Sequence, residues 1–245
     1  MCNQGNVEGK IMANSLIKLN QEIKEIELDS FDDLSIELSS DSTLNLKLLN
    51  FDEKDQLSFK AKVGKNSHLV VTFADFAKGD INLKTTIDLL EENASCDWHL
   101  ATLGSANSKK HFDISFNHEV GHTFADMNNY GVARDKSNII FSGVNHIKEH
   151  ASNSKTIQNA KIIVFDKEAS GQASPILRID ENNVQASHAA IVGQLNNDHM
   201  FYLMSRGLTK EEAKMIITLG YLQPISKNFS DKNKEKIEAA IKEAM

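Results

Sequence analysis

Apolar and polar residues alternate along most of this chain. Between Leu34 and Leu38 every second residue is apolar, and the pattern returns between Leu44 and Leu48 after a turn-forming cluster at residues 39–42. A period of two is typical of a strand with one buried face. The preceding residues, 1–30, mix charged and apolar positions, and between residues 11 and 28 the pattern fits short strands or a helix equally. We therefore treat 1–30 as an N-terminal segment of undetermined structure.

The same alternation recurs as far as Leu195. Strand-like stretches occupy residues 69–73, 81–87, 98–102, 112–116, 138–141, 161–165, 176–179 and 184–192. No convincing amphipathic helix separates them. Many short strands without helices leave three architectures open, which are a sandwich, a barrel and a solenoid.

The turns favour the solenoid. Clusters of small residues recur where strands should end, at residues 93–95, 150–152, 168–170 and 185–187. Stacked coils place small polar residues at their corners and bury one continuous core. The dipeptides Asn-Gly and Asp-Gly, which typify tight hairpins, are absent. We therefore expect a mainly β protein whose residues 31–195 form a parallel β-helix.

After Leu195 the period changes from two to about 3.6, which indicates helices. Residues 197–198 can cap a first helix that ends at Gly207. Thr209 and Glu212 form a capping box for a second helix, and Pro224 fits its end. Residues 230–231 open a third helix. Residues 196–245 are thus predicted to be a C-terminal helical domain that closes the β body.

Composition narrows the possible functions. The 245 residues include 27 Lys and Arg against 34 Asp and Glu, a net charge of -7. This charge argues against a nucleic-acid binder, and no apolar stretch is long enough to span a membrane. Two cysteines, Cys2 and Cys96, exclude a disulfide framework or a cysteine-rich metal site within the chain. Residues 1–14 lack the apolar region of a secretory signal, so we expect a cytoplasmic protein.

One short motif matches a known metal site. Residues 118–122 read His-Glu-Val-Gly-His, the H-E-x-x-H pattern of zinc hydrolases. On a helix, His118 and His122 could hold zinc while Glu119 acts as general base. The alternation before His118 instead predicts a strand, and residues 128–131 read as a loop. We favour a coil corner here and keep the zinc hydrolase as an alternative.

His188 is a second candidate. By strand parity it shares a face with the small residues Ala186 and Ala190. It fits either a core or interface histidine hydrogen-bonded to backbone, or a ligand with room for a metal or a partner chain. The chain has no Walker A sequence, no G-x-G-x-x-G and no G-x-S-x-G. Any ATP-driven process would therefore need an ATPase from a partner.

The stretch from Ala160 to Leu222 resembles the SufB/SufD family of iron–sulfur cluster assembly proteins, and especially its SufD side. The matching residues are Ser174–Ile179, Asn183–Gly193, Phe201–Gly207, Glu212–Ala213 and Gly220–Tyr221. A weaker likeness extends back to about Leu69 and includes residues 118–123 and 141–143.

The resemblance implies a right-handed parallel β-helix (solenoid) core and a C-terminal helical domain. It implies a scaffold rather than an enzyme, whose β-helix pairs with a SufB-like protein or a second copy and whose helices dock a SufC-like ABC ATPase. His188 would face iron or a nascent cluster shared transiently with a partner, with no cofactor held tightly by this chain alone. The docking residues implied are Phe201, Tyr202, Arg206, Gly207, Gly220 and Tyr221.

Two departures from the family pattern matter. Ala186 stands where many members carry a cysteine two residues before the histidine, so this chain offers no local thiolate for a cluster. The long N-terminal helical region of typical members is also missing. A third alternative therefore stays open beside the scaffold and the zinc hydrolase, namely a β-solenoid binding module with no role in cluster assembly.

Overall fold

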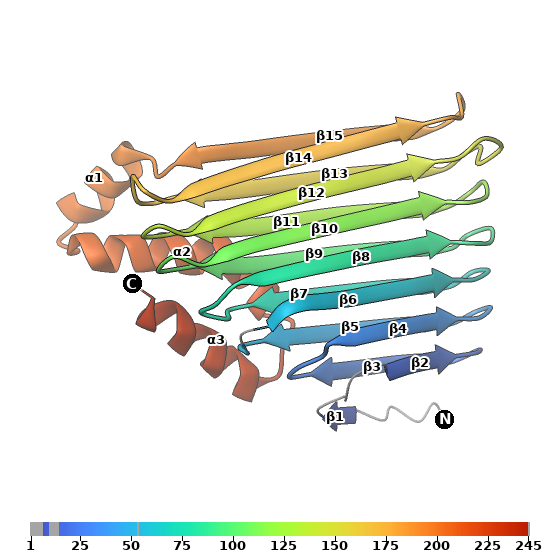
Figure 1. Cartoon of the computed structure of the whole chain (residues 1–245), viewed down its shortest axis with the longest axis horizontal. Coiled ribbons are helices and arrows are strands. Elements are labelled where there is room, and N and C mark those ends of the chain that lie inside the picture. Colours follow the sequence, from blue (N-terminus) through green and yellow to red (C-terminus); the bar gives the residue numbers. More distant parts are fainter. Residues whose placement is uncertain (1–6, 10–14, 53, 245) are drawn as a thin grey trace.

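Two parallel β-sheets face each other in the computed structural model, which describes residues 7–9, 15–52 and 54–244. The chain alternates between the sheets, so that each coil adds one strand to each (Figure 1). One sheet has the order β1-β3-β5-β7-β9-β11-β13-β15 and the other β14-β12-β10-β8-β6-β4-β2. Every pairing is parallel, which confirms the predicted parallel β-solenoid.

The strands differ mainly in length, with ten residues in most of the later ones. They are β1 (Val7–Gly9), β2 (Ser15–Leu19), β3 (Ile23–Leu28), β4 (Asp33–Leu38), β5 (Thr43–Asn50), β6 (Lys54–Val63), β7 (His68–Asp75), β8 (Ile81–Leu89), β9 (Ser95–Gly104), β10 (Lys109–His118), β11 (Phe124–Ala133), β12 (Asn138–Ile147), β13 (Lys155–Val164), β14 (Ser170–Ile179) and β15 (Gln185–Gln194). Three helices follow: α1 (Asn197–Ser205), α2 (Lys210–Ser226) and α3 (Asp231–Glu243).

The N-terminal segment is now partly assigned. Residues 15–28 form β2 and β3, which pair with β4 and β5 and so belong to the solenoid. Residues 1–6 and 10–14, including Cys2, lie outside the described residues. One expected corner is corrected, because Gln185–Ser187 opens strand β15 instead of lying in a turn.

In-register stacking explains the core. Each inward residue lies above its equivalent in the coil below, so apolar positions form continuous columns. One such column runs Leu44, Leu69, Cys96 and Ala125, all fully buried. Phe73, Phe112 and Phe141 make successive ring contacts across the interior. The alternation read from the sequence is therefore the alternation between solvent and this shared core.

The corners that lead from the second sheet to the first carry a ladder of polar side chains, which we call the amide ladder. Its members are Asp41, Asn66, Asn93, His122, Asn153 and Asn183. All but Asn183 have a positive φ, a conformation that Asn and Asp tolerate well. Most neighbouring side chains are hydrogen-bonded, as where Asn93 Nδ2 donates to Asn66 Oδ1 at 3.0 Å; Asn93 and His122 are joined through backbone instead. The ladder joins successive coils along this edge.

A buried ion pair lies beneath the opposite corners. Lys110 Nζ is 2.7 Å from Asp75 Oδ2, and both side chains are fully buried. Thr102 and Asn50 donate hydrogen bonds to the same carboxylate, and Lys110 also donates to a backbone carbonyl. Removing one partner of such a pair would leave an uncompensated charge in the core. The network therefore restricts which strands can be neighbours here.

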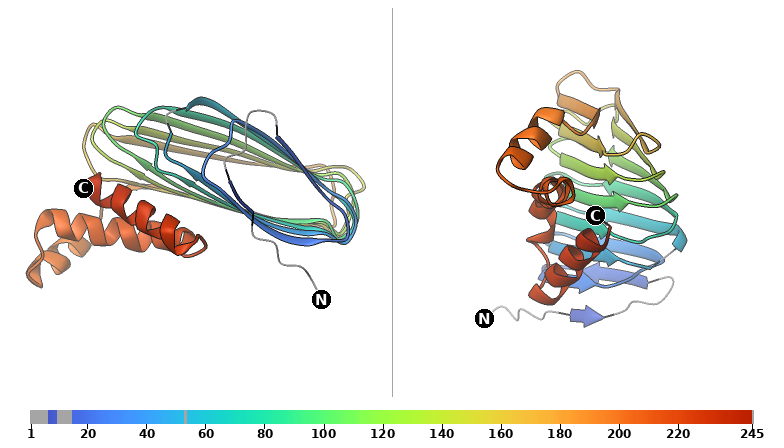
Figure 2. Two further views of the ribbon diagram at one scale, coloured as in Figure 1. Left: turned by 90° about the horizontal axis from the view of Figure 1, so that it is seen from below. Right: turned by 90° about the vertical axis from the view of Figure 1, so that its left-hand side faces the viewer.

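The helices cover one end of the first sheet (Figure 2). Leu222 and Ile225 of α2, with Ile237 and Ile241 of α3, pack in a second apolar cluster with the outward side chains of β5, β7, β9 and β11. At one end of α3, Ser230 and Asn233 bind Glu27. At the other end Lys78 pairs with Glu243 at 2.5 Å. These contacts hold the α2–α3 pair firmly against the stack.

The helix ends follow the sequence signals closely, with small corrections. Asn196, rather than residues 197–198, caps α1 by accepting a hydrogen bond from the Asp198 N–H. The Thr209–Glu212 capping box is present, with hydrogen bonds in both directions. α2 continues to Ser226, just beyond Pro224. Ser230 precedes α3 without a side-chain cap, because its hydroxyl donates to Glu27.

Candidate functional site

The last coil differs from all earlier coils because nothing in the described part of the chain stacks on it. All ten residues of β15 are exposed, although five of them have the inward parity that is buried in β13. Strand β14 is half open, and Ile176, Ile179, Ile191 and Val192 are exposed apolar side chains on these two strands. In Figure 1 both strands form one uncovered end of the stack. Such an unpaired edge can add a strand from another chain.

His188 lies on this uncovered strand. It is in register with Gln158 of β13, which is in register with Met127 of β11 and then Trp98 of β9. The column is apolar and buried up to Met127 and becomes polar at Gln158. His188 thus has inward parity but is exposed, because the coil above it is missing.

Buried polar groups gather in the coils just below. The His118 Nδ1 atom is 2.7 Å from Thr123 Oγ1, which is 2.8 Å from Ser154 Oγ. Asn145 Nδ2 donates to Thr156 Oγ1 at 2.6 Å. His118 Nε2, Asn145 Oδ1 and Gln158 Oε1 are buried without a hydrogen-bond partner in the structure. A buried polar atom in this condition is costly and calls for an explanation.

The structure places the three H-E-x-x-H side chains in different surroundings. His118 is buried at the end of β10, whereas His122 is exposed in the amide ladder, 3.4 Å from Asn153 Nδ2. Glu119 pairs with Lys148 at 2.6 Å. The motif spans a strand end and a bend instead of a helix. Across the described residues no three His, Cys, Asp or Glu side chains are grouped to hold a metal.

The electrostatics of His118 and Cys96 agree with structural roles. Burial, and then the nearby His146, lowers the pKa of His118 to about 4, so the ring is neutral at pH 7. Burial, with Asp97 and Asp126 nearby, raises the pKa of the Cys96 thiol. Cys96 is a neutral thiol inside the core and is not placed to act as a thiolate ligand.

A second exposed apolar surface lies on α1, at the end of the molecule that bears the helices. Phe201 is 75 % exposed and Tyr202 is 57 % exposed, and the Arg206 guanidinium lies 5.2 Å from the Tyr202 ring centroid. Only Met200 of α1 is buried. Gly207, with a φ of 96°, ends α1 in the left-handed conformation that favours glycine.

The remaining two docking candidates, Gly220 and Tyr221, both lie on α2 but differ in exposure. Gly220 is exposed, whereas the Tyr221 ring packs edge-on against Tyr130 of β11 at 5.8 Å, with Lys161 Nζ above it. Burial, with Tyr130 nearby, raises the pKa of Tyr221. Tyr221 therefore contributes to the helix–sheet contact, while Phe201, Tyr202, Arg206, Gly207 and Gly220 are available at the surface.

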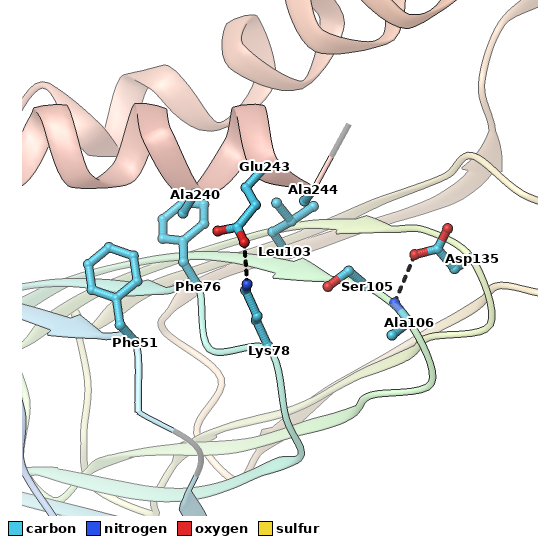
Figure 3. Close-up of a pocket in the computed structure, with 10 residues that line it drawn as sticks. All are labelled: Phe51, Phe76, Lys78, Leu103, Ser105, Ala106, Asp135, Ala240, Glu243 and Ala244. Atoms are coloured by element: carbon cyan, nitrogen blue, oxygen red, sulfur yellow. Dashed lines mark hydrogen bonds and ion pairs between the residues drawn. The ribbon is translucent and has the colours of Figure 1, made fainter.

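The cavity in Figure 3 lies between α3 and the solenoid corners and has a volume of about 460 Å³. It is lined by Phe51, Phe76, Lys78, Leu103, Ser105, Ala106, Asp135, Ala240, Glu243 and Ala244. Its ionisable groups are engaged, since Lys78 pairs with Glu243 and Asp135 accepts a hydrogen bond from the Ala106 N–H. The lining holds no histidine or cysteine, and the cavity is best explained as imperfect packing of α3.

Among the described helices, none combines the length and the apolar character needed to cross a bilayer.

Comparison with known proteins identifies the family. The sequence model described as "SUF system FeS cluster assembly, SufBD core domain" matches residues 32–221, which is well over half of the chain. The chain belongs to the SufBD family. The match covers the solenoid from β4 onward together with α1 and most of α2, so it includes both the open end and the exposed helix surface.

The individual relatives place the chain near SufD. It is 30 % identical over 162 residues to the iron–sulfur cluster assembly protein SufD of Bacillus subtilis, covering 66 % of this chain and 37 % of that protein. It is 23 % identical over 195 residues to SufBD family proteins of Staphylococcus saprophyticus and Staphylococcus haemolyticus, covering 68 % of this chain and 42 % of each. The chain thus matches only about two fifths of the length of these relatives.

Two features of the site were missed from the sequence. One is the open end itself, which depends on where the last coil lies. The other is the polar interior at Asn145, Thr156 and Gln158. The alternation in residues 155–164 contains a signal for it, because Thr156 and Gln158 occupy positions whose parity is inward.

Proposed function

We propose that this SufBD family chain is a non-catalytic scaffold subunit of a SUF-type iron–sulfur cluster assembly complex. The observation that carries the proposal is the uncovered last coil, where an exposed histidine and exposed aliphatic side chains lie on an unpaired strand. An enzyme would need a pocket with converging reactive groups. The described cavity between α3 and the solenoid offers none.

The open end supports pairing with a SufB-like protein or a second copy of this chain. Among the described strands none pairs with the outer side of β15, so its outward backbone N–H and C=O groups are available to bind another strand. Exposed Ile191 and Val192 add apolar area that such pairing would bury. Pro175 in the neighbouring edge strand β14 cannot donate a backbone hydrogen bond, which favours β15 as the pairing edge.

His188 is the proposed ligand for iron or a nascent cluster, which is the cargo of the complex. An imidazole nitrogen is a suitable iron ligand. Among the described residues no cysteine is placed to complete a site, because Ala186 lies two residues before His188 and Cys96 is buried in the core. The proposal therefore assigns the thiolates to the partner. This fits a cluster that is shared at an interface and not held by this chain alone.

The exposed surface of α1 supports docking of a SufC-like ABC ATPase. Phe201 and Tyr202 are large aromatic side chains that a monomer gains nothing by exposing. α1 packs against α2, which in turn packs on β7, β9 and β11. Force applied to α1 would thus reach the solenoid through α2. The cytoplasmic location expected from the sequence stays a prediction.

Anaerobic co-purification with the ABC ATPase tests the docking proposal. Replacing both aromatics, with Phe201→Ser and Tyr202→Ser, should reduce ATPase recovery at least tenfold, a loss of about 1.4 kcal/mol or more. Glu238→Ser, at an exposed position of α3, is the control and should leave recovery unchanged. Equal recovery with the aromatic variant would refute docking at α1. Point variants are preferable to removal of all three helices, which would expose the apolar cluster on β5, β7, β9 and β11.

A further inference from the structure

Gln158 lies directly beneath His188. The two residues are in-register neighbours on β13 and β15, and their side chains share the inward face of the first sheet. Neighbouring strands are about 4.8 Å apart, so a carboxamide on one strand can reach an imidazole on the next. Gln158 is buried, whereas His188 is exposed. The column therefore presents one fixed polar group beneath one accessible ring.

A glycine on the opposite sheet makes room for this carboxamide. Gly143 of β12 faces Gln158 across the interior, and a Cβ atom built at Gly143 would lie 1.6 Å from Gln158 Nε2. Any larger residue at position 143 would displace the amide. The interior of this coil is thus shaped to hold Gln158, although glutamine is a costly residue in a core.

The carbonyl of Gln158 is left unsatisfied. Gln158 Oε1 is buried and has no hydrogen-bond partner in the structure. The buried amide of Asn145 does not satisfy it, since Asn145 Nδ2 donates to Thr156 Oγ1 at 2.6 Å. The imidazole of His188, one rung above, is a donor with no hydrogen-bond partner among the described residues. On an uncovered strand, this ring is free to turn toward the carbonyl below.

We propose that Gln158 is a positioning residue for His188. Its Oε1 accepts a hydrogen bond from one ring N–H of His188, which fixes the tautomer and leaves the lone pair of the other nitrogen toward the open end. A ligating histidine usually donates its second ring N–H to such an acceptor, which fixes the ring and strengthens the ligand. The inference rests on the proposed function in assigning that lone pair to iron, but the hydrogen bond itself does not.

The tautomer of His188 tests the hydrogen bond in the free protein. Nitrogen-15 NMR of the ring should show one predominant neutral tautomer in the wild type. Gln158→Met has a similar volume but no acceptor, and it should give a mixture. Gly143→Ala, which displaces the amide, should have the same effect through a different residue. Asn145→Leu removes another unsatisfied buried carbonyl that is in register with Leu177 and not with His188, so it should change nothing.

Binding of Fe²⁺ alone, under anaerobic conditions and with the partner complex assembled, tests the consequence. Gln158→Met should weaken iron binding about tenfold, the lower end of the range for loss of such an acceptor. Gln158→Glu keeps an acceptor and should restore most of the affinity. A core that is merely disturbed would respond to Gln158→Met and Asn145→Leu alike.

The two proposals fail in different ways. If Gln158→Met leaves the tautomer ratio of His188 unchanged in a folded protein, the positioning role is overturned while the scaffold proposal stands. If the tautomer changes but His188→Ala leaves iron binding intact, the hydrogen bond exists and the ligand role of His188 is wrong.

Discussion

The closed coils and the last two coils of the solenoid have the same backbone and the same register but different interiors. In the closed coils the inward column that leads to His188 is aliphatic or aromatic, at Leu46, Val71 and Trp98, and it is fully buried. In the last two coils the same column continues as Gln158 and His188. Stacking alone therefore does not require an apolar interior at every level. The inward side chains of the lower coils are buried, whereas polar side chains are tolerated at the inward positions of the last coils.

The closed coils and the last coil therefore contribute differently to stability and to function, although they belong to one repeating structure. A closed coil gains free energy from burial on both sides, whereas the last coil gains from one side only. Substitutions on the last coil should therefore change folding stability little, and its residues are available for recognition. The same reasoning applies to the helices, where α2 and α3 are held by buried contacts and α1 is exposed.

The largest expected effect comes from a pair of isoleucines in neighbouring coils. Ile147 and Ile179 are in register on β12 and β14, but Ile147 is 0 % exposed and Ile179 is 37 % exposed. Ile147→Ala should lower the free energy of unfolding by about 2–5 kcal/mol, because it leaves a cavity in the core. Ile179→Ala should cost less than about 1 kcal/mol. Urea denaturation measures both.

The same pair tests whether the end is covered in the complex. If a partner chain stacks on β14 and β15, Ile179→Ala should weaken that association although it barely changes the stability of the free chain. Similar unfolding costs for the two variants in the free protein would mean that the last coil is already closed, and the comparison between coils would be wrong.

The next largest effect is a pH dependence of stability that His118, in the polar interior, should cause. The pKa of His118 is about 4 in the folded protein and near 6.5 in an unfolded chain, so the unfolded chain binds more protons between these values. Stability is complete above about pH 6.5 and falls as the pH drops toward about 4. The difference between the two pKa values corresponds to about 3 kcal/mol in the free energy of unfolding.

His118→Gln removes the titrating ring and should flatten this part of the pH profile, measured by urea denaturation at several pH values. Exposed carboxylates contribute equally to both proteins, so the difference between the two profiles reports on His118. Parallel profiles would mean that His118 is not buried in its neutral form.

Much of the solenoid could be predicted because its physics is local. Alternation with period two shows which residues face inward, as in residues 112–116, and the change of period after Leu195 marks the start of the helices. The capping box at Thr209 and Glu212 fixes the start of α2 by contacts three residues apart. Such signals need no knowledge of the neighbouring coil.

What escaped prediction depends on contacts between coils. Gln158 and His188 are 30 positions apart, and only the register of β13 with β15 makes them neighbours. Coil lengths vary, so this register cannot be counted from the sequence. His122 shows the same limit, because its spacing from His118 matches a zinc motif while its position in the amide ladder becomes visible only when Asn93 and Asn153 are placed beside it. Ladder positions are defined by stacking, not by local pattern.

The smallest expected effect concerns His122, at the boundary between the closed coils and the polar coils. His122 occupies the ladder position between Asn93 of the closed coils and Asn153 of the polar coils, with a φ of 58°. Among the described residues its side chain makes one contact, the long 3.4 Å approach to Asn153, whereas other members make hydrogen bonds of 2.9 to 3.0 Å. His122→Asn should supply an amide that both tolerates this backbone and completes the ladder, and should stabilise the protein by about 0.5–1 kcal/mol. Thermal unfolding measures the gain, and His122→Ala, which lacks the amide and disfavours positive φ, should lose stability instead. If Asn and Ala behave alike at this position, the side-chain ladder contributes nothing and the corners are held by backbone hydrogen bonds alone.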